Sequence, residues 1–471
     1  MEVYEKMRRV RKLVALLLSL AMVLAMSGIA MAAAPVVLTD GEAGGSNTFA
    51  KDNPTSQGKQ INLKKELTVY NFNETTIYAP TISYNYAISA GSADKDITDA
   101  TTDHASGVAV NAKTKAGVTP ENVVLTGQDQ TAGTPTIAWT CAETVTAADG
   151  GEANYKTLTI DFSAIVFNAA GVYRYVITET PNSYATSGVT ETKAGTVAGS
   201  HVRYLDVYVR PVQTGFTDGS LATDWDIYGY VCFYEEQEIT DAGDTATTGA
   251  MKTNGFVAGT KDGTAIKADS YYTYNVTVSK TVTNDAYAKA THSFPFTVIF
   301  TNANISDNVD IKSTTTGTVG GFTDPGAGNL STGISGILTI KDSSSVKYIG
   351  IPNGTTVEVY ETNDVSGVTY LVTTTTDGTA ATDNAVISGT APTSAVSQTT
   401  KEAYQSTKTT ITPTADADDD TAHTIAIDNN LQNISPTGLM FRYGPYVLIL
   451  LCGALLLFLG VKFMRRNKEE D

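Results

Sequence analysis

The sequence contains very little cysteine, with three residues in a chain of 471. Cys452 lies in a long apolar run near the C-terminus, which leaves Cys141 and Cys232 for the rest of the chain. A disulfide framework of the kind that stabilises small secreted domains is therefore excluded. Both remaining cysteines lie in apolar, strand-like contexts. We expect buried thiols, with one disulfide between them as the alternative.

Positive charge is also scarce, since 32 Lys and Arg stand against 49 Asp and Glu and the net charge is -17. The two ends are the basic parts. Residues 1–32 carry five basic and two acidic side chains (+3), and residues 438–471 carry five and three (+2). The remainder therefore carries a net charge of -22. Such an acidic surface argues against nucleic acid as a partner and against adsorption to anionic lipid.

Residue patterns of catalytic and metal sites are lacking as well. The four histidines are scattered through polar segments and show no metal-ligand spacing. No Gly-x-Ser-x-Gly motif and no phosphate-binding loop is present. We therefore expect no metal, no cofactor and no enzymatic turnover of an external substrate.

Both ends of the chain have the pattern of export and anchoring segments. A basic stretch and an apolar run end in a small-x-small cleavage site, which predicts a signal peptide over residues 1–32. Residues 446–464 carry no charge before Lys462, which is enough for one membrane-spanning helix. The basic residues beyond this helix predict a cytoplasmic C-terminus.

A short motif precedes the helix and consists of Ile434, Ser435, Pro436, Thr437 and Gly438. The order of motif, apolar helix and basic tail resembles the cell-wall sorting signal of Gram-positive surface proteins. In that family sortase cuts between Thr and Gly and joins the Thr carboxyl to an amine, here after Thr437. The resemblance implies that residues 433–471 are a sorting signal and that the mature chain is attached to peptidoglycan. The alternative is a plain tail anchor.

The segment between the two ends alternates apolar and polar side chains and lacks a sustained helical stripe. Many short strands separated by Gly, Asn, Asp and Thr turns predict an all-β chain of antiparallel sandwiches. A weak internal repeat predicts two tandem units, residues 35–272 and 273–432. Three or four residues separate the last expected strand of the first unit from the first strand of the second. So short a connection predicts a stiff rod.

Each unit carries a lysine, a glutamate and an amide or carboxyl on the apolar face of its strands, because alternate residues of a strand share a face. Asn254 is an alternative to the carboxyl of the first unit. The expected sets are Lys65, Glu179 and Asp269 in the first unit, and Lys280, Glu361 and Asn429 in the second.

Unpaired charges in a sandwich core are very costly. Desolvation lowers the pKa of lysine and raises that of glutamic acid, so a neutral amine can face a neutral acid. The amine can attack the side-chain carbonyl of Asn or Asp while the glutamic acid polarises that carbonyl and shuttles the proton. The product is an amide cross-link between the first and last strands, with loss of ammonia from Asn or water from Asp. The ordinary alternative is a pair of salt bridges.

The strands that carry Lys65 and Lys280, and the run Gly-Val-Tyr-x-Tyr-x-Ile-Thr-Glu that ends at Glu179, resemble the intramolecular isopeptide domains of Gram-positive backbone pilins. The closest type is the two-domain streptococcal T-antigen pilin. The resemblance implies immunoglobulin-like sandwiches in which Glu179 and Glu361 promote the bonds. It also implies a pilus subunit on a Gram-positive surface, with sortase, neighbouring pilins and peptidoglycan as partners. The alternative is a monomeric wall-anchored adhesin that binds a host or partner ligand.

Polymerisation requires an exposed lysine whose amine attacks the Thr437 acyl-enzyme of the next subunit. In the T-antigen type this lysine lies in a Gly-Ser-Lys turn just before the closing strand of the first domain. Gly259-Thr260-Lys261 stands in nearly that place. Lys261 is therefore the candidate linking lysine, with Lys252 and Lys267 as alternatives.

Overall fold

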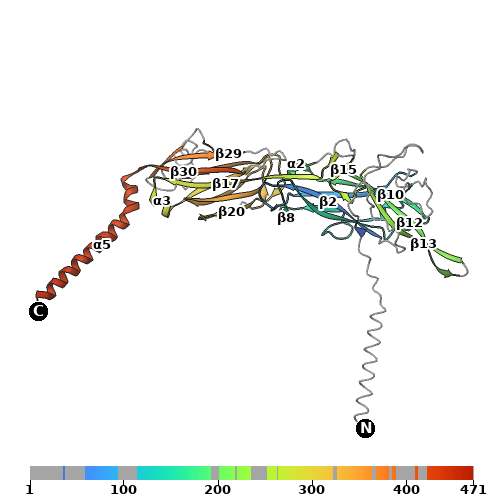
Figure 1. Ribbon diagram of the computed structural model, residues 1–471, viewed down its shortest axis with the longest axis horizontal. Helices are drawn as coiled ribbons and strands as arrows, with labels where there is room; N and C mark the ends of the chain where they lie inside the picture. The colour runs from blue at the N-terminus through green and yellow to red at the C-terminus, as the bar shows by residue number, and fades with distance from the viewer. Residues whose placement is uncertain are drawn as a thin grey trace, which may run out of the picture.

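The described part of the chain is elongated and consists mainly of β-strands (Figure 1). The strands follow the long axis, and one helix extends from the end that carries the C-terminus. This confirms the all-β prediction, while the predicted signal peptide lies outside the described residues. The computed structural model describes residues 36–37, 59–93, 114–191, 201–217, 220–234, 252–261, 264–321, 326–362, 368–380, 385–388, 409–411 and 422–469.

In the first half of the chain, strands of two sheets bury one shared hydrophobic cluster. One sheet contains β1 (Val36–Val37), β2 (Gln60–Tyr70), β6 (Val124–Gly127), β9 (Glu152–Asp161), β11 (Val189–Thr190) and β14 (Gly255–Phe256). The other contains β4 (Ile82–Ala90), β5 (Thr114–Ala116), β7 (Thr136–Trp139), β10 (Gly171–Pro181), β12 (Val202–Thr217) and β13 (Ser220–Phe233). Smaller elements are β3 (Thr76–Tyr78) with β8 (Thr144–Thr146), β15 (Gly259–Lys261) with β16 (Thr264–Ile266), η1 (Pro120–Asn122) and α2 (Tyr184–Ser187).

The second half repeats this plan around its own cluster of buried residues. One set of strands contains β17 (Asp269–Thr283), β20 (Lys312–Thr316), β24 (Ser344–Pro352), β26 (Val368–Thr376), β27 (Thr379–Ala380), β28 (Ala385–Ser388) and β30 (His423–Ile434). The other contains β18 (Ser293–Thr301), β21 (Val319–Gly320), β23 (Ile334–Lys341), β25 (Thr356–Glu361) and β29 (Thr409–Ile411). The small elements are α3 (Ala286–Thr291) and the pair β19 (Asn308–Val309) with β22 (Gly328–Asn329).

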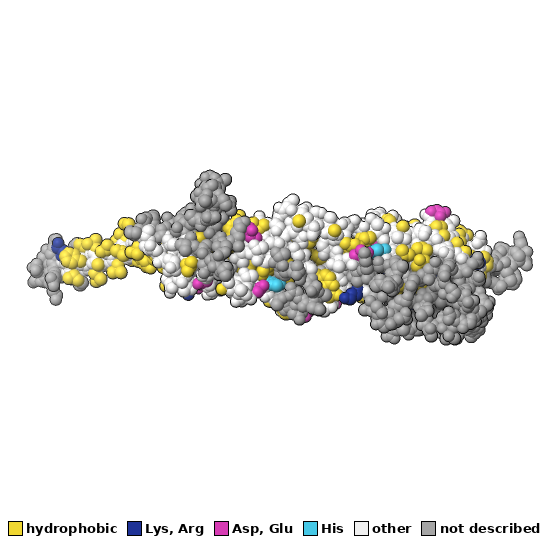
Figure 2. All heavy atoms as spheres, turned by 90° about the horizontal axis from the view of Figure 1, so that it is seen from above, with side chains coloured by type: hydrophobic (Ala, Val, Ile, Leu, Met, Phe, Trp, Pro, Cys, Tyr) yellow, Lys and Arg dark blue, Asp and Glu magenta, His cyan; other side chains and the backbone are white. Residues whose placement is uncertain are grey.

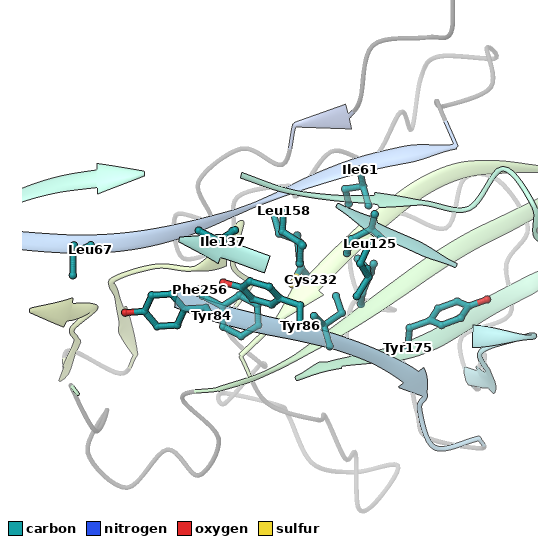
Figure 3. Packing of buried hydrophobic residues seen from close by; sticks show 14 of the residues in the cluster. Ile61, Leu67, Tyr84, Tyr86, Leu125, Ile137, Leu158, Tyr175, Cys232 and Phe256 are labelled. Atoms are coloured by element: carbon teal, nitrogen blue, oxygen red, sulfur yellow. The ribbon is translucent and has the colours of Figure 1, made fainter. Parts of the chain in front are cut away.

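The burial of β2 follows the alternation expected of a strand that forms one wall of a core. Ile61, Leu63 and Leu67 are fully buried, and Figure 3 shows Leu67 on this strand above the aromatic side chains of the cluster. Glu66 breaks the alternation because it is buried on the opposite face. There its carboxylate accepts a hydrogen bond from the backbone N–H of Ala258, which offsets the cost of burying it.

The two halves share strand β17, so the predicted gap of three or four residues between the units is wrong. The first four residues of β17 pair in parallel with β2, and from Thr273 onward the same strand pairs with β24 and β30. No turn interrupts it. Close to the point where its partners change, the side chains of Asn71 and Asn275 exchange two hydrogen bonds of 3.0 and 2.9 Å. The domain boundary near residue 272 stays a prediction, and any such boundary falls within a strand.

The C-terminal helix α5 (Pro436–Glu469) contains one segment long and apolar enough to cross a membrane, Tyr443–Lys462, with a mean hydropathy of 2.4. None of this segment is buried, and Figure 2 shows hydrophobic side chains covering the helix at one end of the molecule. The segment begins three residues before the predicted span. Of the sorting motif, Ile434 ends β30 and Pro436, Thr437 and Gly438 lie in the first turn of α5. The carbonyl of Ser435 accepts a hydrogen bond from the backbone N–H of Leu439.

Cys141 and Cys232 are separate buried thiols, as the first of the two alternatives predicted. Burial raises the pKa of the Cys232 thiol to about 12, which makes it a poor nucleophile. Cys452 is exposed on α5.

Candidate functional site

The structure brings Lys65, Glu179 and Asp269 together in the first half of the chain. Lys65 Nζ lies 2.8 Å from Glu179 Oε1 and 2.8 Å from Asp269 Oδ2. The register explains the second contact, because Asp269 pairs with Leu67 in the parallel ladder of β17 and β2 and so lies beside Lys65. Glu179 approaches from β10 in the other sheet. All three side chains are buried. We call these three residues the first cluster.

Hydrogen-bond donors surround the two carboxylates of the first cluster. The Tyr86 hydroxyl donates to Glu179 Oε2 at 2.6 Å, and the Tyr184 hydroxyl donates to Asp269 Oδ2 at 2.9 Å. His201 Nδ1 lies 3.1 Å from Glu179 Oε1. The donors to Glu179 favour its charged form, since hydrogen bonds to a carboxylate favour ionisation.

The ionisation of Glu179 differs from the expectation. Burial by itself raises the pKa of Glu179, but the Lys65 ammonium and hydrogen bonds from His201, Lys65 and Tyr86 outweigh burial and lower the pKa. The prediction that desolvation would make this acid neutral is therefore wrong, because it took no account of the donors. Burial and the negative charge of Glu179 raise the pKa of Tyr86 well above its usual value, so its hydroxyl stays a donor.

The second half holds the corresponding set, Lys280, Glu361 and Asn429, which we call the second cluster. Lys280 Nζ lies 3.0 Å from Glu361 Oε2, and Asn429 Nδ2 donates a short hydrogen bond to Glu361 Oε1. In the parallel ladder of β17 and β30, Lys280 pairs with Ile427, so Asn429 is the next inward residue along β30. All three members of the cluster are fully buried.

The second cluster lies in an apolar setting. Lys280 Nζ is 4.7 Å from the centre of the Phe294 ring, and Phe296 pairs directly with Glu361 across β18 and β25. Burial lowers the pKa of Lys280, although the charge of Glu361 opposes this shift. The amine is therefore closer to the neutral form that a nucleophile needs.

The carboxamide of Asn429 faces Glu361 with its nitrogen, whereas the expected chemistry needs the carbonyl oxygen there. Among the described residues, Asn429 Oδ1 has no hydrogen-bond partner although it is buried. A half-turn of the carboxamide would place Oδ1 on Glu361, where a protonated Glu361 could polarise the carbonyl. The structure therefore holds the two reactants on either side of one carboxyl group.

The remaining predicted residues are placed less completely. Lys261 ends β15 opposite Thr264, and its side chain lies outside the described residues, as does that of Thr437. Asn254, the alternative acceptor, contributes its backbone oxygen to the N–H of Lys64. The other candidate acceptor, Asp269, places its side-chain carboxyl 2.8 Å from the Lys65 amine.

Three polar residues that contact the first cluster, namely Tyr86, Tyr184 and His201, were not identified from the sequence as part of the site. Tyr86 pairs directly with Glu179 across β4 and β10, and the backbone N–H of Glu179 donates to the carbonyl of His201. For Tyr86 the sequence signal was its alternation with Tyr84 on an apolar face, but only the order of the strands shows that it meets Glu179. Tyr184 belongs to the one-turn helix α2, which had no periodic signal. Among the described residues, no group of three or more His, Cys, Asp or Glu is arranged to hold a metal ion.

Comparisons with known proteins add little beyond this geometry. A family model described as a domain of unknown function (DUF7601) matches residues 274–396, which is less than half of the chain. No curated protein matches the chain in sequence.

Several solved structures are similar over most of the chain. The major pilin protein T3.2 of Streptococcus pyogenes is 14% identical over 80% of this chain and 100% of that one, with a TM-score of 0.32. Another S. pyogenes major pilin is 18% identical over 78% and 98%, with a TM-score of 0.31. A Mobiluncus mulieris adhesin with intramolecular disulfide, isopeptide and ester cross-links is 13% identical over 80% and 100%, with a TM-score of 0.22. At such TM-scores these similarities carry no argument, so the function is inferred from the two clusters.

Proposed function

We propose that the chain is a structural surface protein in which two intramolecular amide bonds join Lys65 to Asp269 and Lys280 to Asn429. One observation carries the proposal: two buried clusters of lysine, glutamate and acyl acceptor lie at equivalent places in the two halves. Buried ion pairs are poor sources of stability compared with apolar packing. Two of them in matching positions therefore favour a chemical role over a structural one.

The reaction of the second cluster balances without an external reagent. The Lys280 ammonium transfers one proton to the Glu361 carboxylate, and the resulting amine attacks the side-chain carbonyl carbon of Asn429. The new carbon–nitrogen bond replaces the bond to the amide nitrogen, which leaves as ammonia. Glu361 remains protonated and lies within reach of both partners before the reaction.

In the first cluster the leaving group is water. The Lys65 ammonium and the Asp269 carboxylate condense to an amide, and one carboxylate oxygen leaves with two of the ammonium hydrogens. The contact of 2.8 Å between Lys65 Nζ and Asp269 Oδ2 brings the two groups together. Holding reactants at such distances replaces much of the entropy that a bimolecular reaction would lose.

The positions of the bonds suit a protein that carries load. Asp269 and Lys280 both belong to β17, so one strand would be covalently joined to β2 in the first half and to β30 in the second. β30 leads directly into the sorting motif and α5. A pull on Thr437 would therefore pass along β30, β17 and β2 through covalent bonds.

We further propose that sortase joins Thr437 either to a lysine of a neighbouring subunit or to peptidoglycan, which makes the chain a pilus subunit on a Gram-positive surface. Lys261 is the candidate linking lysine. The elongated arrangement of the two halves and the apolar helix after the motif support this proposal. A monomeric wall-anchored adhesin is the competing outcome.

Peptide mass spectrometry of the intact expressed chain tests the bonds. We expect the Lys280 and Asn429 peptides to be joined with loss of ammonia, and the Lys65 and Asp269 peptides with loss of water. Glu361→Gln should abolish the second bond. Glu358→Gln, three strand positions away and therefore on the other face of β25, is the matched control and should leave it intact. Free Lys280 and Lys65 peptides from the wild type would overturn the proposal.

An immunoblot of wall extracts from the native host tests polymerisation. A ladder of high-mass species is expected from the wild type. Lys261→Ala should reduce it to a single band that is still attached through Thr437, whereas Lys252→Ala and Lys267→Ala should keep the ladder. A single band from the wild type would favour the adhesin.

A further inference from the structure

His201 gives the first cluster a connection to solvent. Its Nδ1 lies 3.1 Å from Glu179 Oε1, and its Nε2 lies 3.1 Å from Glu191 Oε1. The side chains of His201 and Glu191 are 25% and 31% exposed, whereas that of Glu179 is 1% exposed. Tyr184 links His201 to the acceptor, because its hydroxyl donates to Asp269 and lies 3.5 Å from His201 Nε2.

The two proposed bonds leave their glutamates in different protonation states. In the second cluster the leaving ammonia takes one ammonium hydrogen and Glu361 keeps another. In the first cluster the leaving water takes two hydrogens from the Lys65 ammonium, so none remains for Glu179. Once the amide has formed, Glu179 is a buried carboxylate that has lost the ammonium 2.8 Å away. A buried charge without a counter-charge is costly.

We propose that His201 is a positioning residue whose protonated ring supplies the counter-charge of Glu179 as Lys65 becomes an amide, so that the first bond forms preferentially at mildly acidic pH. This inference rests on the proposed cross-linking function. The ring acts through Glu179 and does not touch Lys65 or Asp269 through any of its described hydrogen bonds.

The groups around His201 favour its charged form. Glu179 faces it from β10, Glu191 from the residue after β11, and Asp269 acts on it from β17. Tyr184 from α2 is the neutral neighbour, since burial and these carboxylates raise its pKa. The hydrogen bond to Glu179 raises the pKa of His201, although partial burial opposes the shift. The ring therefore titrates above its usual range.

Refolding at different pH values tests the role of His201. The full chain, recovered unfolded from inclusion bodies, is refolded into detergent between about pH 5 and pH 9, a range that spans the titration of histidine. Peptide mass spectrometry then gives the fraction of each bond against time. In the wild type the first bond should form more slowly as the pH rises through the pKa of His201. The bond between Lys280 and Asn429 should not follow that profile, and it serves as the internal control.

The decisive variant is His201→Asn, because its amide nitrogen can take the place of Nδ1 as an uncharged donor to Glu179. We expect slower formation of the first bond, by about tenfold, at acidic pH and loss of the dependence on pH around the pKa of histidine. His423→Asn removes another histidine–carboxylate pair, 3.0 Å from Asp377, and should change neither bond. Formation of the second bond shows that the second half of each variant has folded.

The outcomes separate this inference from the proposed function. If His201→Asn keeps the wild-type pH profile, the profile belongs to a group other than His201 and the role of His201 is overturned. If the wild type forms only the second bond, the first-cluster bond and the role of His201 fail together while the second bond stands. If neither bond forms at any pH, the cross-linking function itself is overturned.

Discussion

The two clusters share a backbone plan and differ in the polarity of their surroundings. Tyr86 pairs with Glu179 across β4 and β10, and Phe296 pairs with Glu361 in the same way across β18 and β25. One inward position earlier on these strands, Tyr84 lies against the first lysine and Phe294 against the second. The second cluster therefore lacks the phenol hydroxyl that Tyr86 donates to Glu179 in the first.

This difference in surroundings determines whether each lysine and glutamate pair favours its charged or its neutral form. The donors of the first cluster stabilise the charged pair and lower the pKa of Glu179. In the second cluster burial lowers the pKa of Lys280, which favours the neutral amine. Equivalent positions on one fold can thus favour either an ion pair or its reaction, and the neighbouring side chains set the balance. We expect the second bond to form faster than the first.

The largest effect should come from Lys280→Ala. The bond to Asn429 would close a loop of more than a hundred residues, and a cross-link of that length stabilises a fold by about 5 kcal/mol in the chain-entropy account. We expect hydrogen exchange at β30 amides to report a loss of stability of this order. Lys289→Ala, on the exposed side of α3, is the control and should change it by less than about 0.5 kcal/mol. Equal protection in both variants would show that no bond forms.

A smaller effect is expected from Tyr86→Phe, which gives the first cluster the side chain of the second. It removes a buried hydrogen bond of 2.6 Å to a carboxylate, and such bonds contribute about 1.5–3 kcal/mol. Urea unfolding of the chain should show a loss in that range. Tyr155→Phe, at a half-exposed position on β9, should be nearly neutral.

Acid unfolding gives this variant a second readout. Before the first bond forms, Glu179 has a folded pKa below its ordinary value of 4.5, so its contribution is present above that value and is lost as the pH falls through the folded pKa. Without the Tyr86 donor the folded pKa of Glu179 should rise toward 4.5. The variant should therefore begin to lose stability at a higher pH than the wild type. If the variant and the wild type lose stability at the same low pH, the remaining partners of Glu179 are sufficient to keep its pKa low.

The inward placement of both clusters could be predicted from the sequence, because the side-chain period of a strand is two. Lys65 and Lys280 have the parity of their apolar neighbours, and both are buried. The polar partners could not be predicted in this way. That Tyr86 and His201 meet Glu179 depends on β10 having β4 and β12 as its neighbours, which is a matter of non-local pairing.

The continuity of β17 was missed for a related reason. The sequence predicted a last strand for the first unit and a first strand for the second, and both lie within β17. Local alternation does not show whether two adjacent strands are one. The structure shows them as one strand, and the buried side chains of Asn71 and Asn275 hydrogen-bond each other where the pairing passes from β2 to β24 and β30.

His201 should also make a small contribution to stability that depends on pH. Its folded pKa is raised above the ordinary value of 6.5, so the contribution is present below 6.5 and is lost as the pH rises through the folded pKa. Because the ring is partly exposed, we expect less than about 1 kcal/mol. The thermal midpoint of the wild type should fall over this pH window, whereas that of His201→Asn should stay flat. If the thermal midpoints of the wild type and of His201→Asn change with pH in the same way, the titrating group is not His201.

The smallest change is expected from Asp269→Asn, which should leave the final mass of the chain unaltered. Loss of ammonia from Asn and loss of water from Asp give the same amide to Lys65, so the cross-linked variant and wild type should be indistinguishable by intact mass. The proton count differs, however, because departure of ammonia leaves one proton on Glu179. The counter-charge from His201 is then no longer needed, and the first bond should form with the weak pH dependence of the second. If the variant forms the bond but keeps the pH profile of the wild type, the acceptor is not what distinguishes the two clusters, and the phenol hydroxyls of the first would have to account for the difference.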